Sequence, residues 1–192
     1  ESWWETLSPA WKEVLIKANS ALGTAQPKIE HLTQTLNLTQ LNLDSAGIET
    51  LAPVVRFVSL SSISFSNNPS VADLLPLTEV KTLRELVGKN TGVQDLSVLK
   101  ENTRLERIDM EFSPTGSVLS LEALPKLSYL NINGSQVDAE EMPVFQLQRP
   151  DIAVIYRTDA LSKWWTGLDE AWKQVLLEKI KVSGDPSTEQ LH

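Results

Sequence analysis

The residue types that usually carry out acid–base or metal chemistry are sparse in this sequence of 192 residues. It has two histidines, His31 and His192, and neither has a second histidine or a carboxylate at the spacing of metal ligands. Adjacent carboxylates occur at two places, Glu140 with Glu141 and Asp169 with Glu170. Each pair lies in the first turn of an expected helix, where negative charge favours the positive end of the helix dipole. These pairs therefore indicate helix starts rather than an active site.

The motifs of common enzyme classes are also missing from the sequence. It contains no GxGxxG, no GxxxxGK[ST] and no GxSxG. It contains no cysteine, which excludes disulfides and thiolate metal sites. We therefore expect no enzymatic activity, no metal and no cofactor.

The composition narrows the class of partner. Hydrophobic residues make up 41% of the chain and charged residues 22%, as in globular proteins. The formal net charge of −8 argues against a nucleic-acid partner, which requires a basic face. No apolar run reaches the roughly 18 to 20 residues that span a bilayer, so we expect no membrane insertion.

Tryptophan is a further residue type that could bind a ligand, by stacking on a sugar or a peptide. All six tryptophans lie in two segments, "WWETLSPAWKEVL" from Trp3 and "WWTGLDEAWKQVL" from Trp164. Eight of the thirteen aligned positions are identical, which indicates an internal duplication.

A second periodicity fills the region between the two tryptophan segments. Units of the form LxxLxL begin at Leu38, Leu60, Leu83, Leu105 and Leu127, at intervals of 22, 23, 22 and 22 residues. A fixed period in the twenties with this pattern is typical of leucine-rich repeats. In the first unit Leu41 and Leu43 should point inward from a short strand. Ile48, Leu51 and Val54 should then form the inward stripe of a helical or 3₁₀ turn.

Stacking such units makes a continuous core that no single unit can form. The sequence therefore predicts an α/β repeat solenoid, a right-handed curved array with parallel strands on the concave face and helical caps.

Two repeats depart from the common pattern. Gly88 occupies a place where a leucine is expected, so the third strand should be underpacked, and the longer turn "EFSPTGS" after Met110 should bulge outward as a loop.

The tryptophan segment has the pattern of a helical cap, which a solenoid needs at its open ends. Ser8 can cap a helix that starts with Pro9, and Asp169 takes the same place in the second copy. Ser2, with Glu5 three residues later, predicts a capping box for a short first turn.

Helical spacing predicts that one apolar face of this cap is buried against the first repeat. Its residues are Trp4, Leu7, Trp11, Val14 and Leu15. Trp3 and Trp164 lie off that face and are the better candidates for exposure, and for stacking on a sugar or a peptide.

We expect four segments in the chain. Residues 1–33 form an N-terminal helical cap, 34–137 five leucine-rich repeats and 138–157 a closing unit. Residues 158–192 either cap this array or begin a further module. In the second copy residues 186–191 keep the proline-to-leucine interval of residues 27–32, which lead into the first repeat.

This order of motifs resembles bacterial leucine-rich-repeat proteins, particularly those of Bacteroidetes. The resemblance rests on WWxxLxxxWKxxL at residues 3–15, the repeats at 38–137 and a closing FxxxxPxxxVIY at 145–156. Ala153 lies near the place of the cysteine that is usual in the closing motif. The resemblance implies a non-enzymatic solenoid that binds other macromolecules, often in exported or surface-attached proteins, and it implies no fixed ligand.

The default binding site is the concave face, formed by the outward residues of the five strands. The candidates are Gln40, Asn42, Asp44, Ser62, Ser64, Ser66, Glu85, Lys89, Arg107, Asp109, Glu111, Tyr129, Asn131 and Asn133. This polar surface suits a protein or peptide held by hydrogen bonds around an aromatic anchor, for which Tyr129 is the candidate. The alternative is a carbohydrate-binding or cell-surface adhesion protein that uses exposed aromatic residues.

Overall fold

The structure is a computed structural model, which describes residues 3–23, 27–184 and 186. It divides into two compact units, residues 1–154 and residues 155–192.

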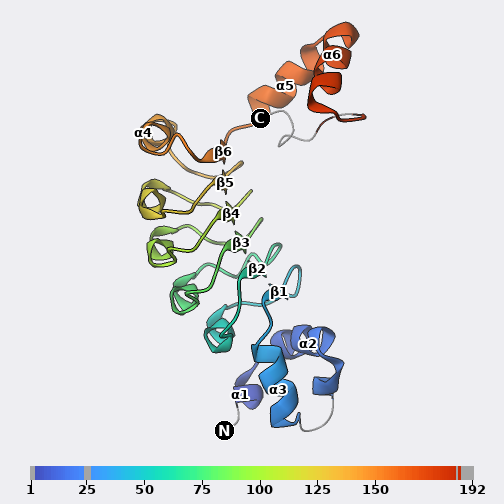
Figure 1. Cartoon of the computed structure of the whole chain (residues 1–192), viewed down its shortest axis with the longest axis vertical. Helices are drawn as coiled ribbons and strands as arrows, with labels where there is room; N and C mark the ends of the chain where they lie inside the picture. Colours follow the sequence, from blue (N-terminus) through green and yellow to red (C-terminus); the bar gives the residue numbers. More distant parts are fainter. Residues whose placement is uncertain (1–2, 24–26, 185, 187–192) are drawn as a thin grey trace. The chain divides into compact units, whose positions relative to one another are not determined.

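A six-stranded parallel sheet in sequence order, β1 to β6, forms one side of the repeats (Figure 1). The strands are β1 (Gln40–Asn42), β2 (Ser62–Ser64), β3 (Glu85–Val87), β4 (Arg107–Asp109), β5 (Tyr129–Asn131) and β6 (Ala153–Ile155). Central residues of β1 to β5 stand in register: Leu41, Ile63, Leu86, Ile108 and Leu130. All five are buried, because the pleat turns every second side chain inward.

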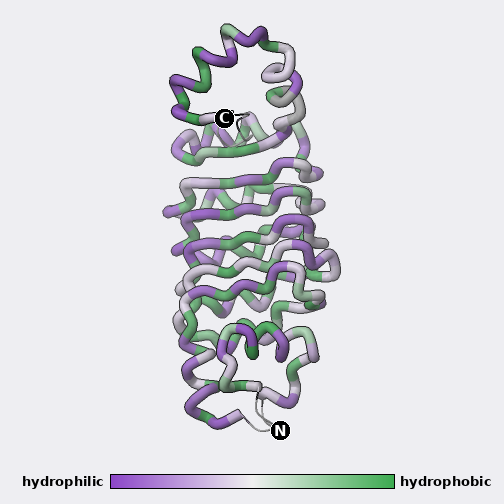
Figure 2. Tube along the Cα trace, turned by 90° about the vertical axis from the view of Figure 1, so that its right-hand side faces the viewer, coloured by the Kyte–Doolittle hydropathy of each residue, from purple (hydrophilic) through white to green (hydrophobic). Residues whose placement is uncertain are grey.

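Short 3₁₀ helices form the opposite side of the array. They are η2 (Ala52–Arg56), η3 (Leu75–Glu79), η4 (Ser97–Glu101) and η5 (Leu119–Ala123). A unit of 22 or 23 residues leaves room for such a tight turn but not for a long helix. Figure 2 shows the repeats stacked as rungs along which hydrophobic and hydrophilic residues alternate.

The core runs as continuous columns through the stacked repeats, which confirms the predicted solenoid. In the first repeat Leu41, Leu43, Ile48, Leu51 and Val54 are all buried. Asn68 is one of the buried polar residues of the repeats. The amide of the buried Asn68 donates hydrogen bonds to the carbonyls of Leu43, Phe65 and Ser66, at 2.9, 2.8 and 3.1 Å. The Asn68 side chain thereby links the turn of the second repeat to the first repeat through the Leu43 carbonyl.

Gly88 does not leave the third strand underpacked, and that expectation is wrong. A Cβ at Gly88 would lie 2.5 Å from Cζ of Phe65 and 3.0 Å from Sδ of Met110. The Phe65 ring of the preceding repeat therefore occupies the space of the missing side chain. A large residue in one repeat and a glycine in the next keep the packing dense.

The segment "EFSPTGS" does not bulge outward as a whole, which corrects the second expectation. Ser113 and Thr115 are fully buried. The Ser113 hydroxyl donates to the Gly88 carbonyl at 2.8 Å and accepts from the Thr91 amide at 3.1 Å. These hydrogen bonds tie the turn to the preceding repeat. Phe112 is the large side chain of the segment that points to solvent.

The N-terminal cap consists of α1 (Trp3–Thr6), α2 (Pro9–Ala18), η1 (Ser20–Gly23) and α3 (Ile29–Leu36). As predicted, Ser8 caps α2 by accepting the Trp11 amide at 3.3 Å, with Pro9 in the first turn. Leu7, Trp11, Val14 and Leu15 are buried, while Trp4 is half-buried. The capping box expected from Ser2 lies outside the described residues.

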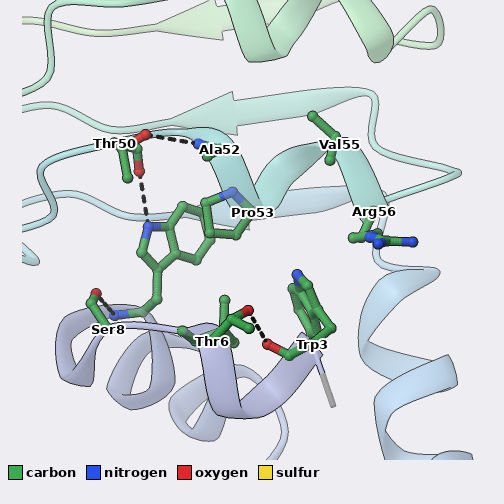
Figure 3. Close-up of a pocket in the computed structure, with 10 residues that line it drawn as sticks. Trp3, Thr6, Ser8, Thr50, Ala52, Pro53, Val55 and Arg56 are labelled. Carbon is green, nitrogen blue, oxygen red and sulfur yellow. Dashed lines mark hydrogen bonds between the residues drawn. The ribbon is translucent and has the colours of Figure 1, made fainter. Parts of the chain in front are cut away.

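The cap joins the first repeat through the indole of Trp11. Its Nε1 donates a hydrogen bond to the Thr50 carbonyl at 2.9 Å, which is one of the two dashed lines that end at Thr50 in Figure 3. Trp11 is buried, with 1% of its surface exposed. The ring therefore contributes apolar burial and a satisfied N–H in one contact.

The far end of the array is closed by α4 (Glu141–Gln148) and Arg149. The Arg149 guanidinium donates to the carbonyls of Glu122, Leu124 and Leu127, at 3.1, 2.8 and 3.0 Å. It also pairs with Asp151 through Nε and Nη2, at 2.9 and 2.7 Å. One side chain thereby binds three carbonyls where the fourth repeat passes into the fifth.

The second unit contains α5 (Asp159–Gly167) and α6 (Glu170–Ile180). Asp169 caps α6 by accepting the Trp172 amide at 2.9 Å, as predicted and as Ser8 does in α2. Trp165 is buried, whereas Trp164 and Trp172 are exposed. No helix in the described part of the chain is long and apolar enough to cross a membrane.

Candidate functional site: the strand face

The predicted site residues form three columns on the outer surface of the sheet, which we call the strand face. The first column is Gln40, Ser62, Glu85, Arg107 and Tyr129, in direct register. The second is Asn42, Ser64, Asp109 and Asn131, also in register, with Val87, which is not a predicted site residue, at its β3 position. The third is Asp44, Ser66, Lys89, Glu111 and Asn133, each two residues after the end of its strand. Parallel pairing in register thus brings together residues that are about 22 positions apart in sequence.

The residues of the third column are linked by side-chain hydrogen bonds. Oδ1 of Asp44 accepts from the Ser66 amide at 2.7 Å and from the Ser64 hydroxyl at 2.6 Å. The Lys89 amide donates to the Ser66 hydroxyl at 3.2 Å. These contacts hold the part of the strand face over β1 to β3 in one arrangement.

Four of the expected residues are buried rather than open to solvent: Ser66, Asp109, Asn131 and Asn133. The cause is the close spacing of parallel strands, which lets neighbouring side chains cover them. The Asn131 side chain accepts a hydrogen bond from the Asn133 amide at 3.1 Å, so it is used within the fold. A ligand would reach the exposed and half-buried members of the set first.

A network of ion pairs lies over β3 and β4. Nζ of Lys89 is 3.1 Å from Oδ2 of Asp109 and 3.1 Å from Oε2 of Glu111. Arg107 approaches the same Asp109 oxygen with Nη2, at 3.6 Å, and Glu85 with Nε, at 3.6 Å. Asp109 is therefore a buried carboxylate between two cations.

The network shifts two pKa values. Burial raises the pKa of Asp109 above its ordinary value, and the hydrogen bond from Lys89 opposes part of the rise. Burial acts to lower the pKa of Lys89, but its hydrogen bonds to Glu111 and Asp109 outweigh burial, so this pKa is raised. The Lys89 ammonium therefore stays charged to a higher pH than an isolated lysine.

Tyr129, the expected anchor, is covered on one face by a cation. The Cζ atom of Arg107 lies 3.5 Å from the centroid of its ring. A guanidinium over a tyrosine ring is a cation–π contact. The pair presents a combined charged and aromatic surface in place of an open ring.

Phe112 borders the strand face and was missed at the sequence level as a site residue. It is 60% exposed and has a left-handed backbone, with φ of 57°. The equivalent positions of the other repeats are also left-handed and carry Ser45, Asn67, Asn90 and Gly134. Small or amide side chains tolerate this conformation, whereas a phenylalanine there is uncommon. Aligning the five repeats at this position would have revealed it.

The residues before Phe112 in this left-handed column bond to one another. The side-chain Nδ2 of Asn67 donates to the Ser45 hydroxyl at 3.3 Å, and the side-chain Nδ2 of Asn90 donates to Oδ1 of Asn67 at 3.2 Å. The Phe112 side chain cannot continue this ladder. Its ring lies against Gly134, where a Cβ would overlap with ring atoms. The glycine of the fifth repeat thus makes room for the aromatic ring of the fourth.

A second candidate is a pocket of about 300 Å³ between the N-terminal cap and the first repeat. Figure 3 shows Trp3 on one wall and Pro53, Val55 and Arg56 on the other. Its lining is mainly apolar, and Trp3 is half-buried there.

Metal ligation has no support in the described part of the chain. Residues 3–23, 27–184 and 186 contain no group of three or more histidine, aspartate or glutamate side chains that could hold a metal ion. His31 lies in α3, and His192 lies outside the described residues.

No family model matches the chain, and no curated protein is similar to it in sequence. Solved structures share its fold. Internalin C2 and the internalin inlF, both from Listeria monocytogenes, give TM-scores of 0.55 and 0.56 at 19% and 20% identity. Each match covers 67% of this chain, and 56% and 44% of the two internalins.

A leucine-rich-repeat protein of Leptospira interrogans gives a TM-score of 0.58 at 19% identity, over 66% of this chain and 33% of that protein. The chain therefore spans between a third and just over half of the length of these proteins. Together with the six parallel strands and the stacked repeats, these matches identify the chain as an α/β leucine-rich-repeat solenoid.

Proposed function

We propose that the chain is a protein- or peptide-binding module, and that its contact surface is the strand face over β3 to β5 together with Phe112. The proposed role involves no catalysis and no cofactor. The observation that carries the proposal is the exposed Phe112 ring on a left-handed backbone.

Phe112 has a cost for the fold without an equivalent gain. A left-handed non-glycine residue costs about 1 kcal/mol or more, and the exposed part of its ring gains little from burial. Strain combined with an exposed aromatic side chain is typical of binding surfaces, where aromatic residues serve as anchors. The adjacent Gly134 supports one side of the ring and leaves the other open.

The ion-pair network beside Phe112 would give such a surface its specificity. Lys89, Asp109, Glu111 and Arg107 are held by one another at 3.1 to 3.6 Å. Side chains that are already ordered lose little entropy when a partner binds. An apolar side chain of the partner would pack on Phe112, and its polar groups would pair with Glu111 and Arg107.

Selection from a displayed library of random peptides tests this proposal, because the library samples many partner sequences at once. Peptides selected on the whole chain should lose at least about tenfold in affinity on Phe112→Asn and on Arg107→Ala, since an anchor is worth more than about 1.4 kcal/mol. The matched control is Leu75→Asn in η3, because Leu75 is 58% exposed on the opposite side of the array.

Binding that survives both strand-face substitutions would contradict the proposal. So would an equal loss with Leu75→Asn, since it would place the peptides elsewhere. Phe112→Asn is not expected to unfold the chain, because asparagine occupies the equivalent positions at Asn67 and Asn90.

The carbohydrate-binding alternative has one observation in its favour, the exposed indole of Trp164. It is 47% exposed, and an open indole face can stack on a sugar ring. A glycan array read with the whole chain and with Trp164→Ala would test it. Glycan binding that is lost in the variant would favour this alternative over the strand face.

A further inference from the structure

The two copies of the tryptophan segment have the same local structure. Ser8 and Asp169 each cap a helix by accepting the amide of the tryptophan three residues later, at 3.3 and 2.9 Å. The helices α2 and α6 begin at equivalent positions, and a shorter helical segment precedes each of them. The duplication therefore preserves the fold of the segment as well as its sequence.

The two copies differ in what their apolar faces contact. In the first copy Trp11 is 1% and Val14 8% exposed. The equivalent residues of the second copy, Trp172 and Val175, are 59% and 49% exposed. The second copy thus keeps the apolar face of a cap, and this face is not covered in the structure.

The first copy shows which partner fits this face. The α2 face packs on the edge of the first leucine-rich repeat, and Trp11 donates its indole N–H to the Thr50 carbonyl just before η2. The same helix borders β1, since Val14 and Leu41 line one pocket. The partner surface is therefore the N-terminal edge of a repeat, with its strand, its 3₁₀ turn and an accepting carbonyl.

The array of this chain offers no such edge to the second copy. Its N-terminal edge is occupied by α2. Its other end is closed by α4 and by Arg149, which holds three carbonyls of residues 122–127. A repeat presents different groups at its two edges, so a face shaped for the first edge is not shaped for the last.

We infer that the face formed by Trp172, Val175 and Leu176 is a docking surface for the N-terminal edge of a second leucine-rich-repeat array. This second array would follow α6 in the chain, as residues 33–57 follow α2. It would pack on α6 as the first repeat packs on α2. The occupant is thus a first repeat of the type found at residues 38–57, with its edge carbonyl accepting the Trp172 indole.

The chain itself supplies a sharp test. Residues 33–157 contain the array and closing unit but no tryptophan, and Leu191 corresponds to Leu32. A chain of residues 1–191 followed directly by a second copy of residues 33–157 therefore carries the same six indoles as the chain alone. The fraction of tryptophan fluorescence that acrylamide quenches should fall in the extended chain, because Trp172 becomes covered.

Two substitutions provide the controls. Trp172→Gln in the extended chain should abolish the added protection and lower the melting temperature of the appended array by several degrees. The same substitution in the unextended chain should leave melting unchanged, since the side chain is already exposed. Gln174→Ala, at the position equivalent to the exposed Glu13 of the first copy, should leave the appended array intact.

Three outcomes would overturn the inference. The first is an appended array that stays unfolded or aggregates. The second is a folded appended array with Trp172 as accessible to acrylamide as before. The third is protection of Trp172 already in the unextended chain, together with a dimer mass by light scattering, which would make a second copy of the chain the occupant. None of these outcomes bears on peptide binding at the strand face, so the two proposals fail independently.

Discussion

The guanidinium of Arg107 stacks on the ring of Tyr129, with Cζ 3.5 Å from the ring centroid. The two residues are direct neighbours in register on β4 and β5, so the sheet itself sets their spacing. Arg107 also pairs with Glu85 and Asp109, at 3.6 Å each. The stack is therefore a junction between the ion-pair network and the aromatic part of the strand face.

This stack should contribute a measurable coupling energy. A double-mutant cycle of Arg107→Ala and Tyr129→Ala should show a coupling of about 0.5–1 kcal/mol in the free energy of unfolding. A second cycle replaces Tyr129→Ala with Tyr129→Phe. Tyr129→Phe keeps the ring and should retain most of the coupling. Urea unfolding at constant pH measures it, and full additivity of the Ala pair would show that the contact has no energetic weight.

Lys89→Met should destabilise the fold in a pH-dependent way. The substitution removes one of the two cations beside the buried Asp109 carboxylate, and a buried acceptor that loses its partner costs about 1–3 kcal/mol. Because the pKa of Asp109 is raised in the fold, protonation favours the folded state. This contribution is complete below the ordinary aspartate pKa and is lost as pH rises through the raised value.

The free energy of unfolding of Lys89→Met should therefore fall more steeply than that of the parent chain between about pH 4 and pH 7. Chemical denaturation at both pH values measures the difference. The double variant Lys89→Met/Asp109→Asn removes the titrating group and is the control. Equal slopes for the single variant and the parent would contradict the assignment to Asp109.

Gly88→Ala should cost about 1–3 kcal/mol, because the added methyl collides with the Phe65 ring and with Met110. Phe65→Leu in the same chain should recover part of the loss, since the smaller side chain gives the methyl room. Thermal unfolding of the two single variants and the double variant measures this. A double variant that is no better than the sum of its parts would show that the clash lies elsewhere.

Arg149→Met should lower the free energy of unfolding by about 1–3 kcal/mol, because carbonyls at the end of the array lose their donor. Arg149→Lys should recover little, since an ammonium cannot reach several carbonyls in the fork geometry. Unfolding in guanidinium chloride compares the two variants with Asp151→Asn, in which the Arg149 side chain is kept. A stable Arg149→Met chain would mean that α4 alone closes the array.

Removal of residues 158–192 should leave the melting temperature of the array unchanged. Arg149 and α4 already close its end, and the tryptophan face of the second copy is shaped for the other edge of a repeat. Thermal unfolding and light scattering of a chain that ends at residue 157 test this. Melting that is several degrees lower, or aggregation, would make the second copy a cap for the array that precedes it.

The repeats were predictable from sequence because their spacing encodes them directly. Leu41, Ile63, Leu86, Ile108 and Leu130 share one place in each unit and therefore share one place in the sheet. The helix starts at Ser8 and Asp169 were predictable for a similar reason, since a cap acts on the three residues that follow it.

The packing at Gly88 was not predictable from its own repeat. The side chain that fills its space belongs to Phe65, one repeat earlier, and no local pattern connects the two positions. The ion pair of Asp109 with Lys89 follows the same rule, because Lys89 belongs to the preceding repeat. Contacts between repeats depend on which residues meet across the stack, and a consensus pattern does not contain that information.

Register pairing from β1 to β5 has a mechanical consequence. In an array of parallel strands stacked side by side, a force along the stack pulls on the hydrogen bonds of one strand pair at a time. Rupture at one end would release one repeat of about 22 residues, which is roughly 75 Å of extended chain. When a single molecule is stretched, its extension should therefore increase in evenly spaced steps, one for each repeat. Unfolding should begin at the less stable end of the array. The hydrogen bond from Trp11 to Thr50 and those of Arg149 stabilise the two ends of the array. Their relative strength then decides at which end unfolding under force begins.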